Sequence, residues 1–266
     1  MIFEAGFSLV IQRKRSIFLL SKSITDRFQI YGDFKVSGNE SCILTAFNAA
    51  IECCAVANDI TSRILHHLKP MIALFLLALT VIITMLAWFV VPKWQFQGML
   101  KPYEAWRHGK WYQLVTSGFL HANGTHLLVN MFVFFFFGPV LEQAIGASSF
   151  LILYFTALVV SSLPTLIQER NNPRYASLGA SGAVEAVLFG YIVMFPLNKI
   201  YFIFIPVGIP AIIFGGLFLA YSYYESRQRR DNVNHVAHIA GAIYGAVYTL
   251  LFVPDAFSRF LGHFGF

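Results

Sequence analysis

Residues 71–91 read MIALFLLALTVIITMLAWFVV, and this stretch decides the class of fold. It contains no charged residue. A helix needs about 20 consecutive apolar residues to cross the hydrocarbon core of a bilayer. The stretch therefore predicts a membrane-spanning helix.

Five further apolar runs of comparable character follow it. They are residues 126–142, 149–167, 178–195, 201–224 and 235–253. The whole chain is 57% hydrophobic and 12% charged, whereas about a quarter of the residues in a soluble domain are charged. We therefore predict an all-α membrane protein with six transmembrane helices in one bundle.

The chain divides into three parts. Residues 1–70 combine a basic cluster with a short apolar run and show no sustained hydrophobic period. We expect them to form a weakly ordered N-terminal extension, or to result from a start assigned upstream of Met71. We predict that residues 71–255 form the membrane domain and that residues 256–266 form a C-terminal tail. The aromatic residues of the first loop, such as Trp106, favour the membrane–water interface.

The distribution of charge and cysteine narrows the set of partners. The formal net charge is +6, but the basic residues are scattered over short loops and the first seventy residues, which disfavours a nucleic-acid-binding face. Cys42, Cys53 and Cys54 all precede the first span, so no disulfide framework or metal-binding pair organises the apolar part. We expect a lipid bilayer around the chain and predict no cofactor and no metal. The sequence leaves the oligomeric state open.

Ser181 lies in the fourth run and is flanked by residues with almost no side chain, in the sequence Gly179-Ala180-Ser181-Gly182-Ala183. Another helix or an extended peptide backbone can therefore approach its hydroxyl closely. Taken alone, such a serine is more often a packing position whose hydroxyl bonds to the preceding turn. It becomes a candidate nucleophile only together with other residues.

A histidine precedes a ridge of small residues in the last run. His238 is followed by Gly241 and Gly245, a spacing typical of helices that pack closely. A neutral imidazole within reach of Ser181 could act as its general base. The alternative is a histidine that bonds to a neighbouring span. His235, three residues earlier, is expected to lie in a loop or at the membrane interface.

Polar residues also mark the start of the second run. His126 and Asn130 are four residues apart and share one helical face. Two donors that point the same way could hold an oxyanion, and loss of one such donor costs about a hundred- to a thousandfold in rate. A metal site is the alternative, but His121 and His126 are five residues apart and do not form an HExxH helix.

Together these motifs resemble the rhomboid family of intramembrane serine proteases, in its bacterial type with a six-span core. The motifs are HxxxxHxxxN at 121–130, GASG at 179–182 and AHxxG with a following glycine at 237–245. The resemblance runs from about residue 71 to residue 253 in the family's order and spacing. It implies six helices with a long first loop.

The resemblance also implies a role for each residue. Ser181 would be the nucleophile and His238 its base, in a dyad that lacks the carboxylate of a Ser-His-Asp triad. His126, Asn130 and the backbone amide of Ser181 would form the oxyanion hole, with His121 supporting them. The expected substrates are transmembrane segments of other proteins, cut near the membrane surface where helix-breaking residues allow unwinding.

Two positions depart from the family's pattern. Members usually carry Trp-Arg nine and eight residues before the first motif histidine, where this chain has Tyr112 and Gln113. Glu185 follows Ser181 by one turn on the same face, where a well-known member has a tyrosine that packs on the catalytic histidine. This carboxyl either orients His238 as a third, triad-like member or is a protonated or hydrated group that lines the cavity.

The fifth run contains several helix-breaking residues, namely Pro206, Gly208, Pro210, Gly215 and Gly216. They predict a flexible or kinked helix. Our hypothesis is that this helix acts as a gate that admits substrate from the lipid.

The orientation in the membrane follows from two arguments that disagree. The loops after the odd-numbered spans hold nine Lys and Arg residues and the opposite side holds ten, eight of them in residues 1–70. Without those eight, the positive-inside rule places the odd-numbered loops in the cytoplasm. The resemblance implies the opposite orientation.

Other functions are less compatible with the sequence. The chain has no HExxH and no Gly-x-Gly-Asp motif, which disfavours zinc and aspartyl intramembrane proteases. A catalytically silent relative that binds membrane clients would lack the nucleophile or the base, and a transporter would show a paired repeat with interrupted helices. We therefore expect a multi-pass serine endopeptidase of a bacterial inner membrane.

Overall fold

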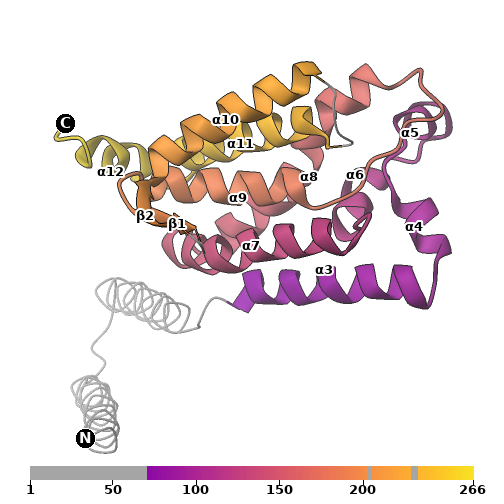
Figure 1. Ribbon diagram of the computed structural model, residues 1–266, viewed down its shortest axis with the longest axis horizontal. Helices are drawn as coiled ribbons and strands as arrows, with labels where there is room; N and C mark the ends of the chain where they lie inside the picture. Colours follow the sequence, from indigo (N-terminus) through magenta and orange to yellow (C-terminus); the bar gives the residue numbers. More distant parts are fainter. Residues whose placement is uncertain (1–70, 203–204, 229–232) are drawn as a thin grey trace, which may run out of the picture. The chain divides into compact units, whose positions relative to one another are not determined.

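The computed structural model describes residues 71–266, except 203–204 and 229–232 (Figure 1). The predicted extension over residues 1–70 lies outside the described residues. The long helices are α3 (Met71–Phe89), α7 (Gly124–Ile145), α8 (Ala147–Gln168), α9 (Ser181–Met194), α10 (Ala211–Gln228) and α11 (His235–Phe252).

The predicted all-α membrane bundle is confirmed. Four of the described helices, α3, α7, α8 and α11, are long and apolar enough to cross a membrane. Helix α9 is apolar but has only 14 residues, and α10 ends in a polar stretch. The count of six spans therefore stays a prediction.

Helix α9 lies at the centre of the bundle, with α7, α8, α10 and α11 around it (Figure 1). All of its residues except Ser181 and Tyr191 are buried. In a bilayer an apolar helix can face either lipid or protein, so it is the surrounding helices that bury α9. The centre of the fold thus coincides with the helix that carries the candidate nucleophile at its start.

Helices α9 and α11 approach until their backbones touch. A Cβ on Gly241 would overlap the carbonyl oxygen of Gly182, and a Cβ on Gly245 would overlap that of Ala186. The absence of side chains at these glycines allows the approach. The small-residue ridge of α11 therefore faces α9.

The first loop folds into short helices. They are α4 (Lys93–Gly98), α5 (Pro102–His108), α6 (Gln113–Thr116) and the 3-10 helix η1 (Ser117–Phe119). Gln113 is buried between them: its Oε1 accepts the N–H of Lys101 at 3.1 Å, and its Nε2 donates to the carbonyl of Gln97 at 3.1 Å. Gln113 thus braces the loop at the position where family members usually carry arginine.

The predicted fifth span was wrong over residues 201–202 and 205–210. Strands β1 (Lys199–Phe202) and β2 (Ile205–Pro210) pair antiparallel, with Ile200 opposite Ile209, and α10 begins only at Ala211. Pro206 and Pro210 lack the N–H that an α-helix needs. The Pro and Gly residues before position 211 therefore belong to a hairpin and do not kink a helix.

The C-terminal segment continues as a further short helix. Helix α12 (Ala256–Gly262) lies within the residues predicted as a tail. Its first residue, Ala256, is fully buried and belongs to the main apolar core. The segment is therefore packed at its start.

A buried carboxylate joins two helices. Glu142, near the end of α7, is 5% exposed and accepts the backbone N–H groups of Ile72 at 3.2 Å and Ala73 at 2.8 Å. These amides belong to the first turn of α3 and have no partner within that helix. A negative charge is also stabilised at a helix N-terminus. Glu142 therefore fixes the start of α3 against α7.

Replacing Glu142 with alanine is expected to lower the free energy of unfolding by about 2 kcal/mol, because it leaves two buried amides without an acceptor. Thermal unfolding in detergent measures the effect. The matched control is Glu169→Ala, since Glu169 is partly exposed and its carboxylate accepts a hydrogen bond from the nearby side chain of Asn172. Equal stability of the two variants would contradict the capping role.

Candidate active site

Ser181 is the first residue of α9, and a braced segment leads into it. Gly179 has a φ of +127°, a conformation that favours glycine. Its N–H donates to the carbonyl of Ser117 at 2.9 Å, and Leu100 and Ser177 exchange two backbone hydrogen bonds of 2.8 and 2.9 Å. The first loop thus fixes the segment that positions Ser181.

His126 lies directly against this segment. A Cβ on Gly179 would come within 2.7 Å of the Nε2 of His126. Asn123 caps α7 by accepting the N–H of His126 at 2.9 Å, which holds the histidine in the first turn. The ring of His126 therefore lies beside Gly179, which is two residues before Ser181 in the chain.

Asn130 lies one turn further along α7 and is buried. Its Nδ2 donates to the carbonyl of His126 at 2.8 Å. An amide nitrogen carries two hydrogens, so one remains for another acceptor. The shared helical face predicted for the two residues agrees with this contact.

His121 is fully buried and contacts the residue before Ser181. Its Nε2 accepts the N–H of Ala180 at 3.5 Å, and its Nδ1 lies 3.1 Å from the Oγ1 of Thr84. The Thr84 hydroxyl donates its single hydrogen to the carbonyl of Phe119 at 2.9 Å. Thr84 must therefore accept a hydrogen from Nδ1, which leaves the Nε2 lone pair for Ala180.

The protonation state of His121 agrees with this network. Burial lowers the pKa of His121 to about 3, and the neighbouring His126 adds to the effect. The ring is thus neutral at neutral pH and keeps one lone pair. The two histidine rings meet edge to face with centroids 5.0 Å apart.

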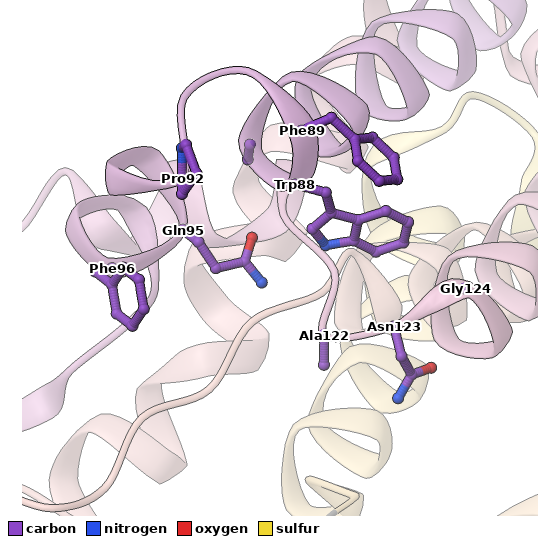
Figure 2. A pocket seen from close by; sticks show the side chains of 9 residues that line it. Trp88, Phe89, Pro92, Gln95, Phe96, Ala122, Asn123 and Gly124 are labelled. Carbon is purple, nitrogen blue, oxygen red and sulfur yellow. The ribbon is translucent and has the colours of Figure 1, made fainter.

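The backbone of His121 is held from the opposite side. Its carbonyl accepts the Nε1–H of Trp88 at 2.9 Å and the Nε2–H of Gln95 at 3.0 Å. Both side chains line an open pocket of about 440 Å³ where α3, α4 and the start of α7 meet (Figure 2). None of the nine residues that line this pocket is a predicted catalytic residue.

His238 lies in the first turn of α11 and faces α9. It shares one helical face with Gly241 and Gly245, the two glycines that touch α9. Gly241 of α11 lies beside Gly182 of α9. The position one turn before Gly241 on the same face therefore lies beside the start of α9. The fold therefore brings His238 to the end of α9 that carries Ser181.

The expectation that His235 lies in a loop was wrong, and the alternative, a place at the membrane interface, stays a prediction. His235 is the first residue of α11, is 6% exposed and packs its ring 6.1 Å from that of Tyr221 and 5.8 Å from that of His238. Burial results from the packing of α10 over α11. No local pattern in the sequence carries this information.

A small polar cavity of about 30 Å³ adjoins Ser181. The polar residues that line this cavity are mainly serines. They are Ser117, Ser161, Ser162, Ser177, Ser181 and Asn234. Asn234 also exchanges hydrogen bonds of 3.1 and 2.9 Å with Thr165. Apart from Ser181, sequence reasoning missed these residues, although Ser161, Ser162 and Thr165 recur at helical spacing in an otherwise apolar run.

Glu185 follows Ser181 by one turn and is 9% exposed. Its buried Oε2 has no hydrogen-bond partner among the described residues. This oxygen does not bond to His238. The triad-like role of Glu185 toward that histidine stays a prediction. Within the same residues, no group of three His, Cys, Asp or Glu side chains could hold a metal ion.

Comparison with known proteins gives a consistent result. Residues 108–255 match the model of the Rhomboid domain. The chain is 36% identical over 87 residues to the putative rhomboid protease YdcA of Bacillus subtilis, covering 33% of this chain and 43% of that protein. It is 30% identical over 177 residues to the chloroplastic Rhomboid-like protein 11 of Arabidopsis thaliana, covering 59% and 58%.

A mitochondrial relative matches a similar region. The chain is 28% identical over 146 residues to the Presenilin-associated rhomboid-like protein A of Danio rerio, covering 51% of this chain and 36% of that protein. The chain thus spans between 36 and 58% of the length of these three relatives.

Proposed function

Because the chain belongs to the rhomboid family, we propose that it is an intramembrane serine endopeptidase that cleaves transmembrane segments of other proteins with Ser181 and His238. The observation that carries this proposal is the convergence of three distant motifs on the start of α9. His126 of α7 lies against Gly179, and the His238 face of α11 lies against α9. Each motif alone has a purely structural explanation.

The first half of the reaction forms an acyl-enzyme. The Oγ of Ser181 attacks the carbonyl carbon of the scissile peptide bond while His238 takes the hydroxyl proton. The tetrahedral intermediate then collapses, the C–N bond breaks, and His238 returns the proton to the leaving amine. The new amino terminus departs, and the rest of the substrate stays bound to Ser181 as an ester.

The second half requires water. A water molecule attacks the ester carbonyl, His238 accepts its proton, and collapse releases the new carboxyl terminus and regenerates the Ser181 hydroxyl. The polar cavity beside Ser181 measures about 30 Å³, and a site of about 10–15 Å³ holds one water when polar partners are present. This cavity is the source that we propose for the hydrolytic water.

The oxyanion of both intermediates needs donors. Ser181 is the first residue of α9, so its N–H has no acceptor within the helix and can point at the anion. His126 and Asn130 would supply two further donors from α7. Donors held by a rigid scaffold stabilise the transition state without having to reorganise.

The length of α9 supports a site below the membrane surface. Its 14 residues correspond to about 21 Å, whereas the hydrocarbon core is about 30 Å thick. If α9 ends near one surface, its start lies below the other. Ser181 would then meet a membrane-spanning substrate within the bilayer.

The surroundings of the protein follow from the same findings. It is an integral membrane protein. We propose the bacterial inner membrane as its location, although the matched relatives also include mitochondrial and chloroplastic proteins. Fractionation of the native host separates these locations.

Reconstitution into liposomes with a transmembrane reporter substrate tests the function directly. A fluorophosphonate probe measures in parallel whether Ser181 reacts as an activated nucleophile. We expect cleavage and labelling by the wild-type protein. If a folded preparation shows neither cleavage nor labelling, the proposal is wrong.

Asn130→Ala is expected to lower kcat/KM about a hundred- to a thousandfold, because one of three oxyanion donors is lost. Cleavage kinetics in liposomes measure the effect. Asn172→Ala is the matched control, since Asn172 lies in an exposed loop and bonds to Glu169. An unchanged rate for Asn130→Ala would remove this residue from the oxyanion hole.

A further inference from the structure

Helix α10 packs along one face of α9 in the opposite direction. A Cβ on Gly215 would lie 3.0 Å from the Cδ1 of Ile192 and 3.4 Å from the Cε1 of Phe189. The ring of Phe218, three residues further along α10, lies 5.9 Å from the ring of Phe189. Later residues of α10 thus meet earlier residues of α9, as Figure 1 also lets the reader follow.

This register brings two polar residues to the same level. Ser222 follows Gly215 by two helical turns, and Glu185 precedes Ile192 by two turns, so each stays on the face already in contact. Ser222 is 1% exposed and Glu185 is 9% exposed. Their side chains therefore face the same buried part of the α9–α10 interface.

Both residues have an oxygen that needs a hydrogen bond. The Oγ of Ser222 and the Oε2 of Glu185 are buried, and neither has a partner among the described residues. The neighbouring contacts of this interface, from Phe189, Ile192 and Phe218, are apolar and offer no hydrogen bond. Buried polar groups without partners are costly and are usually satisfied by each other or by water.

The position of the pair relates it to the candidate active site. Glu185 follows Ser181 by one turn of α9, and Tyr221, beside Ser222, packs against His235. The ring of His235 lies 5.8 Å from that of His238. The pair thus lies next to the two helix ends that carry the candidate nucleophile and base. Gly182, three residues before Glu185, packs against Ser161 of the small polar cavity.

We propose that Glu185 and Ser222 enclose a buried water site between α9 and α10, and that this site fixes α10 beside the catalytic residues. The ligand is water, which bridges the Ser222 hydroxyl and the Glu185 carboxyl. Both are positioning residues, because they act on the reaction through the placement of α10. Their relevance for catalysis rests on the proposed function.

A double-mutant cycle with Glu185→Ala and Ser222→Ala tests whether the two residues are coupled energetically. We expect each single substitution to lower the ratio of folded to unfolded protein about tenfold, and the double variant to lose no more than the larger single effect. Additive effects would overturn the proposal. Ser226→Ala is the matched control, because Ser226 lies one turn further on α10 and bonds to the carbonyl of Tyr223.

Infrared spectroscopy gives a second readout that a loss of packing alone would not produce. The carboxyl stretching band of Glu185 is assigned by its absence from the spectrum of Glu185→Gln. We expect it to shift on exchange into D2O and again in Ser222→Ala, while Ser226→Ala leaves it in place. A band that responds to neither change would overturn the water site.

Kinetics then test the positioning role. We expect Ser222→Ala to raise KM for a transmembrane substrate about tenfold, while labelling of Ser181 by the small fluorophosphonate changes less than twofold. Unchanged KM would overturn the positioning role. If the wild-type protein neither cleaves nor labels but the cycle and the infrared shift are as expected, the proposed function fails and the water site stands.

Discussion

Ser181→Ala is expected to abolish cleavage of a transmembrane substrate, with a loss of about a millionfold in kcat. The methyl group cannot attack the scissile carbonyl, so no acyl-enzyme forms, and the remaining oxyanion donors cannot replace a nucleophile. Cleavage in liposomes and covalent labelling by a fluorophosphonate measure the two consequences. Both signals should fall below detection.

The stability of this variant should change little. Ser181 lies at the first position of α9 and is only partly buried, and alanine is a good helix former. A thermal unfolding midpoint close to that of the wild type would therefore assign the lost activity to chemistry. Ser226→Ala serves as a control for the same substitution on another helix. Persistent cleavage by Ser181→Ala would assign the activity to a different residue.

His238→Ala should reduce kcat by about 10⁴-fold to 10⁶-fold, because the serine loses the base that takes its proton. Removal of the base alone costs about as much as removal of the nucleophile when the two act as a unit. Labelling of Ser181 by the fluorophosphonate should slow as well. Single-turnover measurements separate this chemical step from substrate binding.

The matched control for this prediction is His235→Ala. The two histidines lie three residues apart in α11, and their rings are 5.8 Å apart, so both substitutions remove an imidazole from the same region. We expect His235→Ala to retain activity within about tenfold of the wild type, since a buried packing residue affects the rate only through placement. Loss of activity in His235→Ala with retention in His238→Ala would reverse the assignment of the base.

The features that were predictable from sequence are those that depend on neighbouring residues in the chain. The apolar run over residues 71–91 predicted α3 because hydropathy is a local property. The glycines after His238 predicted a face for close packing, and α11 does touch α9 there. Membership of the rhomboid family could likewise be inferred from short motifs, and the domain match confirms it.

The features that were not predictable depend on contacts between distant segments. Residues 201–202 and 205–210 were predicted as part of a span, but they lie in the antiparallel strands β1 and β2, where the prolines are tolerated. His235 is buried and packs against Tyr221 of another helix, and Gln113 bonds to residues 12 and 16 positions away. A residue's own identity does not specify such partners.

The sequence by itself determined that this protein lies in a lipid bilayer and that its fold is helical. It also determined which residues carry the candidate chemistry. The tertiary structure decided which of those residues meet: His126 lies at Gly179 and His121 at Ala180. The physical reason is that hydropathy and helical period act over one or two turns. The approach of two helices, in contrast, is set by the backbone contact of residues as far apart as Gly182 and Gly241.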